Sequence, residues 1–268
     1  IANKLCKNDI NAPVIEMTMF GITAKFIGEH VFAISGGIFD ISLNNKPIRT
    51  NKAYIAKDGD ILSIKSAKQG LRCYLAVTGG FDVPLFMGSA ATNLKIKVGG
   101  FNGRKLKAGD ILKIGKADKI KNIEKRELPE NTYNNPVKVR VVLGPQDDMF
   151  SENDLLLFSN QQYTVTSDLD RMGIRLWGIA LRGKEKLEII SDAITFGSIQ
   201  ITNSGMPIIL MADHQTTGGY AKIATVISAD LPKLAQVKPK DKISFEIIDI
   251  DIAEKIAIKQ KKHIDKLF

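Results

Sequence analysis

The string KDGDILSI, from Lys57 to Ile64, is the first of three similar stretches in this chain. A turn built on glycine and aspartate leads directly into a short apolar run that is typical of a β-strand. The string returns as KAGDILKI from Lys107 to Ile114 and, more loosely, as PKDKISFEI from Pro239 to Ile247. Repeated units that lead from a turn into a strand predict β-barrel construction. Their irregular spacing argues against a solenoid.

The rest of the chain extends this β pattern. VKVRVV, from Val137 to Val142, alternates apolar and basic residues with the period of a half-buried strand. Further strands are predicted at Val31–Ile34, Ile38–Leu43, Tyr74–Val77, Leu187–Ile190 and Ile208–Met211. Asn44 and Asn45 predict a turn between two of them, since asparagine tolerates positive φ. The sequence therefore predicts a mainly β protein.

Helices are predicted to be few and short. Ser151 and Asp154 have the spacing of a capping box that opens a helix over 152–158. Ser228 is a candidate cap for a short helix over 230–236, in which Pro232 must lie in the first turn. The tail from Asp251 to Leu267 has a narrow apolar stripe, which favours a helix packed on a barrel over a helix at a membrane surface.

A charged, aromatic-poor linker is predicted from Lys116 to Pro136. We therefore divide the chain into a first β domain at 1–120, a second β domain at 136–252 and a basic, helical tail at 253–268. The 268 residues are enough for two modest domains with separate cores.

Composition argues against several classes of protein. The net charge of +9 comes without a basic stripe interleaved with aromatic residues, so nucleic-acid binding is not predicted. No apolar run approaches the roughly 20 residues that span a bilayer, so a membrane protein is not predicted. Cys6 and Cys73 form no close pair, which favours a reducing cytoplasm. Three histidines and these two cysteines make a structural zinc site improbable.

Polar side chains gather instead at strand ends in the second half, within 144–150, 167–176, 196–200 and 212–222. The Walker A, GxGxxG, HExxH and GxSxG motifs are absent from the sequence. The candidate catalytic residues are Asp147, Asp170, Asp213 and Lys222. The candidate substrate-binding residues are Gln146, Arg171, Arg175, Gln200, Gln215, Thr216, Thr217 and Tyr220. Together they suit the binding of a carboxylate or phosphate and the movement of a proton. Taken singly, each has a structural alternative, such as a turn cap or an ion pair.

Several long strings resemble one protein family. They are GLRCYLAVTGGFDVPLFMGSAAT (70–92), GGFNGRKLKAGDILKI (99–114), GPQDDMF (144–150), SDLDRMGIRLWG (167–178) and the run from Ser191 to Gln236 that contains MADHQTTGGYAKIATVISADL. The chain resembles the biotin-dependent carboxyltransferase-like family, also called allophanate hydrolase subunit 2, from Ala2 to about Phe245. The resemblance implies two tandem cyclophilin-like β-barrel domains. It also implies a segment before Ile1, and without that segment we expect an open sheet edge in the first barrel.

The resemblance further implies a role as the C subunit of a bacterial ATP-dependent 5-oxoprolinase, which opens 5-oxoproline to glutamate and is not active as a lone chain. The implied partners are a B subunit that resembles the Kip inhibitor and an A subunit of the LamB/YcsF type. ATP with Mg²⁺ is the expected cofactor, bound without a P-loop at a subunit interface. No covalent biotin is expected, because the chain has no Met-Lys carrier motif.

On this view the candidate residues take separate roles. Arg171, Arg175 and Lys222 supply cations for a phosphoryl group. A carboxylate from Asp147, Asp170 or Asp213 activates water, and the amides of Gln146, Gln200 and Gln215 hold the substrate. Two alternatives from the same family stay open. One is a non-catalytic antagonist that binds a Kip-inhibitor-like protein. The other is the carboxyltransferase component of a biotin-dependent carboxylase of the urea or allophanate type.

Overall fold

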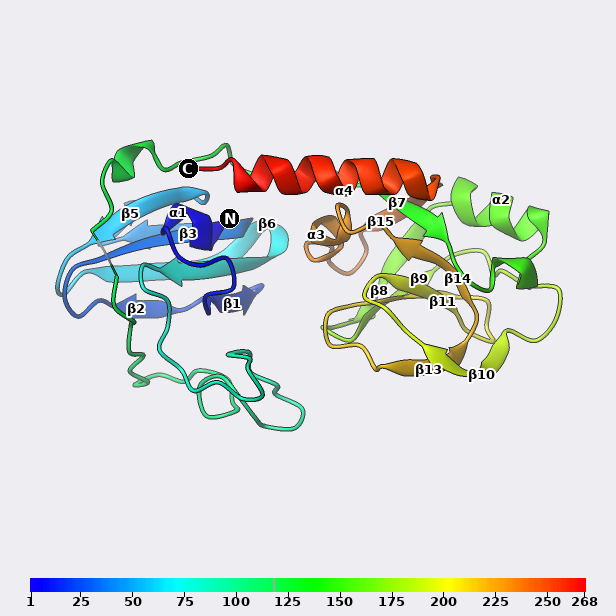
Figure 1. Cartoon of the computed structure of the whole chain (residues 1–268), viewed down its shortest axis with the longest axis horizontal. Helices are drawn as coiled ribbons and strands as arrows, with labels where there is room; N and C mark the ends of the chain where they lie inside the picture. The colour runs from blue at the N-terminus through cyan, green and yellow to red at the C-terminus, as the bar shows by residue number, and fades with distance from the viewer. Residues whose placement is uncertain (118) are drawn as a thin grey trace. The chain divides into compact units, whose positions relative to one another are not determined.

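The computed structural model describes residues 1–117 and 119–268 and divides into two compact units (Figure 1). The first unit comprises 1–131 with 267–268, and the second comprises 132–266. In both units most of the regular elements are β-strands and the helices are few, so the mainly β prediction is confirmed.

The first unit is built around two long antiparallel strands, β3 and β6. Its elements are α1 (Ala2–Leu5), β1 (Ile15–Thr18), β2 (Thr23–Lys25), β3 (His30–Leu43), β4 (Lys46–Pro47), β5 (Lys52–Ala56) and β6 (Ile61–Val77). Strands β1 and β2 pair with β6, while β4 and β5 pair with β3. The two strands predicted at Val31–Ile34 and Ile38–Leu43 are one strand. Shifts of register between Gly36 and Ile41 bend it without ending it.

The repeated turn has the same geometry in all three copies. In each, the aspartate carboxylate accepts a hydrogen bond from the amide three residues earlier, at 2.8 Å for Asp60, 2.7 Å for Asp110 and 3.0 Å for Asp241. The first copy leads into β6 and the third into β15 (Lys242–Ile247). After the second copy no strand forms, and the only pairing is an isolated bridge between Ile114 and Phe81. The prediction of a strand at 111–114 is therefore wrong. Residues 82–113 form an irregular segment that gives it no neighbouring strand to pair with.

Residues 121–131 pack on the first unit, although they were predicted to be a linker. They include the short helix η1 (Ile123–Lys125). Arg49 donates to the Leu128 carbonyl at 2.9 Å, and the Asn51 side chain donates to the Pro129 carbonyl at 2.9 Å. Because these bonds attach 121–131 to the first unit, that unit extends to residue 131, beyond the end at residue 120 given for the first domain in the sequence analysis.

The second unit contains a closed barrel of seven strands in the order β11-β12-β9-β8-β15-β7-β14. Its elements are β7 (Val137–Leu143), η2 (Asp147–Met149), α2 (Glu152–Asn160), β8 (Tyr163–Leu169), β9 (Gly173–Trp177), β10 (Glu188–Ala193), β11 (Ser198–Ile201), β12 (Pro207–Leu210), β13 (Thr217–Tyr220), β14 (Lys222–Val226), α3 (Leu231–Leu234), β15 and α4 (Ile250–Asp265). Strands β10 and β13 form a separate two-stranded ribbon. The barrel thus places the ends of many strands close to one another, where loops can supply a site.

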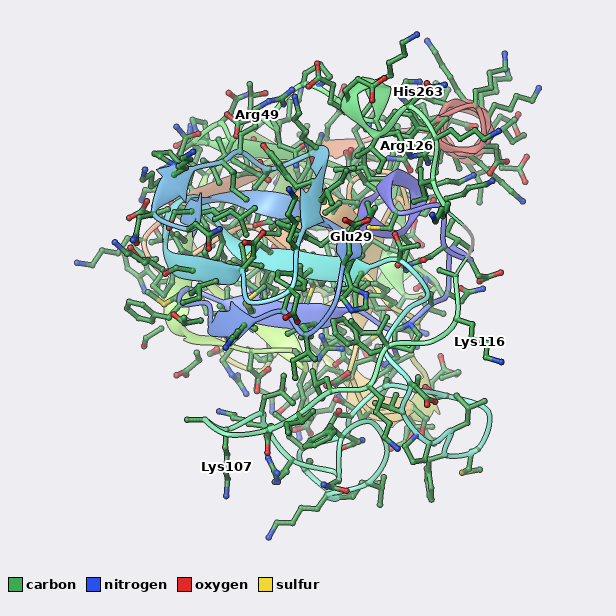
Figure 2. The ribbon with its side chains drawn as sticks, turned by 90° about the vertical axis from the view of Figure 1, so that its left-hand side faces the viewer. Glu29, Arg49, Lys107, Lys116, Arg126 and His263 are labelled. Atoms are coloured by element: carbon green, nitrogen blue, oxygen red, sulfur yellow. The ribbon has the colours of Figure 1, made fainter. Side chains whose placement is uncertain are left out.

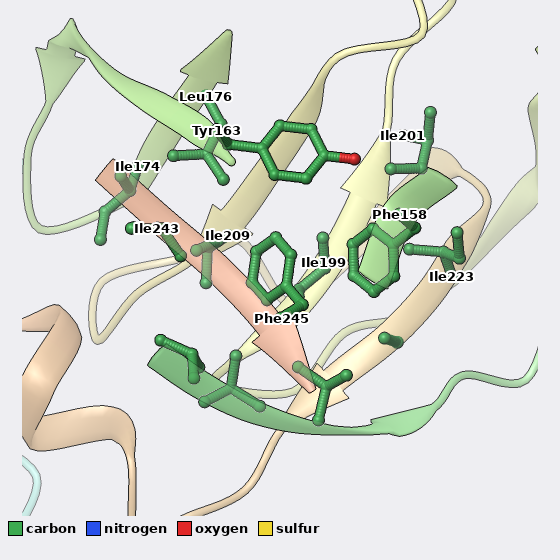
Figure 3. Close-up of a cluster of buried hydrophobic side chains, with 14 of the residues drawn as sticks. Phe158, Tyr163, Ile174, Leu176, Ile199, Ile201, Ile209, Ile223, Ile243 and Phe245 are labelled. Carbon is green, nitrogen blue, oxygen red and sulfur yellow. The ribbon is translucent and has the colours of Figure 1, made fainter. Parts of the chain in front are cut away.

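Aromatic side chains fill the middle of this barrel (Figure 3). Phe158 stacks on Phe245 with ring centroids 4.6 Å apart, and Tyr163 lies 5.5 Å from Phe245. Burial of these rings stabilises the barrel. The strands of the barrel carry the loops that hold the polar residues.

The helices agree with the sequence in two of three cases. Ser151 and Asp154 form the predicted capping box at the start of α2, and the tail forms α4. Helix α3 has only four residues, and its N-cap position is Asp230 rather than Ser228, with no capping hydrogen bond from the side chain. It begins late because the Asp230 amide still belongs to the turn that closes on the Ile227 carbonyl. Within the described residues, no helix is long and apolar enough to cross a membrane.

Candidate functional site

Lys222, at the first position of β14, has its ammonium group buried at the edge of the barrel. Its side chain is only 4% exposed. Nζ lies 2.5 Å from Asp192 Oδ2 and donates to the Ala193 carbonyl at 2.9 Å. A buried charge needs such partners, because removing it from water without them is costly. The Asp192 side chain is 49% exposed, so this ion pair meets solvent on its carboxylate side.

Two glutamine side chains complete the surroundings of Lys222. Gln146 accepts a hydrogen bond from the Lys222 amide at 3.2 Å and donates to Asp192 Oδ2 at 3.5 Å. Gln200 lies opposite Lys222 in the pairing of β11 with β14, is almost fully buried, and donates to the Tyr220 carbonyl at 3.2 Å. Gln146, Asp192, Gln200 and Lys222 are hereafter the ammonium cluster. Three of its four members were predicted from the sequence.

Asp192 is the member that sequence reasoning missed. It lies in the ribbon of β10 and β13, opposite Gly218, while Ala193 lies opposite Thr217. The hydrogen bond from Lys222, followed by that from the Ala193 amide, lowers the pKa of Asp192 below its ordinary value. The carboxylate is therefore ionised at neutral pH. The one signal in the sequence was an acidic residue just after the strand predicted at Leu187–Ile190, which is weak evidence for a role.

Gly144 allows β7 and β14 to approach each other beside the ammonium cluster. Its amide donates to the Ile223 carbonyl at 2.9 Å, and a Cβ placed on it would lie 2.2 Å from the Lys222 carbonyl oxygen. No side chain fits at that distance, so any other residue must push the two strands apart. The glycine of the GPQ string is thus explained by close packing of backbone against the site.

We expect Gly144→Ala to lower the free energy of unfolding by about 2–3 kcal/mol, because the forced shift acts like overpacking of a core. Denaturant unfolding measures this loss. Gly59→Ala is the matched control, since a Cβ there meets nothing within 4 Å and adds only the cost of its left-handed backbone, about 1 kcal/mol. Equal losses for the two variants would contradict the close-packing explanation.

Asp170, Arg171 and Asp213 form a second network, at the turn between β8 and β9. The Asp170 carboxylate accepts hydrogen bonds from the amides of Met172 at 2.7 Å and Gly173 at 3.1 Å, which makes it a turn cap. Arg171 binds Asp213 through two nitrogen atoms at 2.9 and 3.1 Å, and both side chains are nearly half exposed. These contacts support a structural role for each residue, as a turn cap for Asp170 and as an exposed ion pair for Arg171 and Asp213.

The other predicted residues occupy separate positions. Asp147 lies half-buried in η2, and Arg175 is exposed on β9. The carbonyl of exposed Gln215 accepts a hydrogen bond from His214, and that of Thr216 accepts one from Ile194. In the part of the chain that the structure describes, no hydrogen bond joins the side chains of Asp147, Arg175 or Gln215 to the ammonium cluster. Thr217 and Tyr220 are in β13, which pairs with β10, the strand that carries Asp192. Thr217 lies opposite Ala193 in this pairing.

The ammonium cluster has the chemistry of a site for a negatively charged oxygen. It combines a buried cation, two primary amides and a carboxylate that can accept a proton. It lacks the chemistry of a metal centre. Among residues 1–117 and 119–268, no three histidine, cysteine or acidic side chains are grouped to hold a metal ion.

The chain is similar to several known proteins over nearly its whole length. The chain is 38% identical to the C subunit of 5-oxoprolinase from Haemophilus influenzae over 267 residues, which is 99% of this chain and 84% of that protein. It is 36% identical to the protein of the same name from Escherichia coli, over 100% of this chain and 85% of that protein. The crystal structure of the K. lactis urea amidolyase superposes on the whole chain with a TM-score of 0.91 and 30% identity. The matched part is 17% of that chain.

A protein family described as "Carboxyltransferase domain, subdomain A and B" matches residues 1–247. This range includes the sheet of the first unit, the barrel of the second unit and all four residues of the ammonium cluster. The chain therefore belongs to the carboxyltransferase domain family, subdomains A and B.

Proposed function

We propose that this chain is the C subunit of an ATP-dependent 5-oxoprolinase and that its ammonium cluster contacts the substrate. The observation that carries the proposal is Lys222, a buried ammonium held by Asp192 and flanked by two glutamine amides. The names of the two relatives with 36–38% identity support the choice of reaction.

The overall reaction fixes what the residues must do. 5-Oxoproline, ATP and two waters give glutamate, ADP and phosphate, and the bond that breaks is the lactam C–N bond. A phosphoryl group transferred from ATP to the lactam oxygen makes the ring carbon open to attack by the first water. The tetrahedral adduct then expels the ring nitrogen, which takes up a proton, and the acyl phosphate that forms is hydrolysed by the second water to glutamate and phosphate. Lys222 stabilises the negative charge on the lactam oxygen, and Asp192 holds the ammonium in position. Gln146 and Gln200 hold the lactam or the substrate carboxylate.

ATP with Mg²⁺ fits this chain only in part. The ammonium and amides suit phosphate oxygens, but Mg²⁺ prefers carboxylate ligands, and the described residues contain no such group of three. We therefore place the metal ligands on a partner chain and assign no step of this chain to the metal. The partners we propose are the Kip-inhibitor-like B subunit and the LamB/YcsF-type A subunit. A cytoplasmic location accords with Cys6 and Cys73, which are buried free thiols.

Glutamate release from 5-oxoproline by the three purified proteins tests this function. We expect release that requires ATP and falls to background when this chain is omitted. Release by the two partner proteins alone would contradict a catalytic contribution from this chain. Stable binding to the Kip-inhibitor-like partner without any release would favour the antagonist alternative.

Carboxyl transfer is the second candidate, and the superposition of the whole chain on the K. lactis urea amidolyase favours it. A carboxyl group carried by biotin has the same anionic oxygens that suit Lys222. Incubation with labelled bicarbonate, ATP, a biotin carboxylase and its carrier protein separates the two reactions. Label transferred from the carrier to urea only when this chain is present would establish carboxyl transfer.

A further inference from the structure

The ammonium cluster contains hydrogen-bonding groups that the chain itself does not use. Exposed lysines such as Lys107 and Lys116 project from the ribbon (Figure 2), where water satisfies their N–H groups. Lys222 differs, because its side chain is only 4% exposed and its hydrogen bonds must come from the protein or from a ligand. A count of the donors and acceptors in the cluster therefore indicates what a ligand has to supply.

The Gln146 and Asp192 side chains are engaged within the chain at both of their ends. The amide of Gln146 accepts a hydrogen bond from the Lys222 backbone and donates one to Asp192. One carboxylate oxygen of Asp192 accepts from the Lys222 ammonium, and the other accepts from the Ala193 amide at 2.7 Å. These two side chains therefore hold the cluster together, and the groups left for a ligand belong to its other two members.

Lys222 and Gln200 each keep a group without a partner. An ammonium carries three N–H donors, and within the described part of the chain Nζ uses two of them, on Asp192 and on the Ala193 carbonyl. The Gln200 side chain makes one hydrogen bond among the described residues, from Nε2 to the Tyr220 carbonyl at 3.2 Å. Because that carbonyl can only accept, the nitrogen end of the amide must face it. One ammonium N–H and the Gln200 amide oxygen are thus left for a ligand.

The amide oxygen of Gln200 is accessible although the residue as a whole is only 2% exposed. Among residues 1–117 and 119–268, no enclosed side-chain nitrogen or oxygen atom lacks a hydrogen-bond partner. An acceptor oxygen without a partner therefore borders space that solvent or a ligand can enter. The amide is also packed in place, since a Cβ on Gly218 would lie 2.9 Å from Gln200 Nε2. Gln200 thus presents its oxygen from a fixed position, as a recognition group does.

Lys222 and Gln200 lie at opposite positions of two paired strands. They are Cα partners in the pairing of β11 with β14. Directly opposite residues in an antiparallel pair have their side chains on the same face, with Cβ atoms about 4.5–5.5 Å apart. The cluster therefore offers a donor beside an acceptor. A lactam ring has the complementary edge, because ring closure holds its C=O and N–H groups on the same side. A carboxylate or phosphate has no N–H and matches the donor alone.

We propose that Gln200 determines specificity for a cis-amide that carries a free N–H group. The Lys222 ammonium donates to the lactam oxygen of the substrate, and Gln200 Oε1 accepts the hydrogen bond from the lactam N–H. This inference rests on the proposed function, because that function brings a lactam to the cluster. Urea and the ureido ring of biotin have the same edge of C=O and N–H, so the test includes both compounds.

The test compares the affinity of the purified chain for 5-oxoproline and for its N-methyl derivative, measured by ligand-observed NMR. N-methylation removes the donor that Gln200 accepts, so we expect the wild type to bind 5-oxoproline about tenfold more tightly. In Gln200→Met, which keeps the side-chain length but has no amide oxygen, the two affinities should agree within about twofold. Gln161→Met is the matched control and should keep the wild-type ratio, since the Gln161 amide is engaged by Tyr163 and Ile179 outside the cluster.

The ratio of the two affinities within each variant is the deciding quantity, so a general loss of stability does not imitate the expected result. If Gln200→Met does not fold, Gln200→Asn gives the same comparison, because it draws the amide oxygen back by one methylene. An equal ratio in the wild type and the Gln200 variant, or no binding of any of the compounds to the wild type, overturns the inference. Glutamate release by the complex together with such an equal ratio sinks this inference alone. Binding of urea or biotin that depends on Gln200, without binding of 5-oxoproline, supports cis-amide recognition and sinks the proposed function.

Discussion

Replacing Lys222 with methionine is expected to lower ATP-dependent glutamate release by the reconstituted complex about 10³-fold, a loss typical of removing a preorganised electrostatic group from a water-poor site. Methionine keeps much of the length of the buried stem but removes the charge. The ammonium is held at a fixed position by Asp192 and the Ala193 carbonyl, so water replaces it poorly. The measurement is the turnover rate at saturating 5-oxoproline and ATP.

The control for Lys222→Met is Lys242→Met. Lys242 is largely exposed and its ammonium binds Thr164, so it offers the same chemical change at a position outside the ammonium cluster. We expect Lys242→Met to keep full turnover. If Lys222→Met keeps more than a tenth of wild-type turnover, the ammonium cluster is not the place where the lactam reacts. Equal affinity of both variants for the partner proteins separates loss of chemistry from loss of assembly.

The sequence was enough to predict three of the four residues of the ammonium cluster, but not the contacts between them. Lys222 and Gln146 occur in strings that predict strand ends, and the barrel brings them together through the pairing of β7 with β14. Asp192 reaches Lys222 because the ribbon of β10 and β13 places it there. No local pattern encodes that contact, which depends on pairing between strands that are distant in the sequence. Asp170 shows the reverse case, where a plausible catalytic carboxylate caps its own turn.

The repeated turn shows why local patterns predict the fold only in part. The three copies share their Asp-to-amide hydrogen bond because that bond involves residues three apart. A strand also needs a partner. The copies at Asp60 and Asp241 lead into strands with partners already in the sheet or barrel, whereas the copy at Asp110 ends an irregular segment. Turn chemistry is therefore predictable from sequence, but strand formation depends on distant residues.

Asp230 is expected to be the acidic residue on which the second unit most depends. Its side chain is fully buried and accepts hydrogen bonds from the Arg140 amide and guanidinium at 2.7–2.9 Å, and from Lys233 at 2.9 Å. Asp230→Asn removes the buried anion that holds Arg140 and Lys233, whose own side chains are 30% and 45% exposed. We expect Asp230→Asn to lower the free energy of unfolding by about 3 kcal/mol and the melting temperature by roughly 10 °C. Asp213→Asn, which alters an exposed pair, should cost less than about 1 kcal/mol.

The loss at Asp230 should also depend on pH in a defined direction. Burial acts to raise the pKa of this carboxyl, but the hydrogen bonds from Arg140 and Lys233 outweigh it and lower the pKa to about 2. The unfolded chain has an ordinary value near ~3.9. Because the folded pKa is the lower one, the carboxylate stabilises the fold fully above the unfolded value, and this contribution is lost as pH falls towards about 2. The gap in melting temperature between wild type and Asp230→Asn should therefore be full at neutral pH and shrink through the acidic range below the unfolded pKa. A gap that stays constant through this range would show that the variant acts through packing rather than through the buried charge.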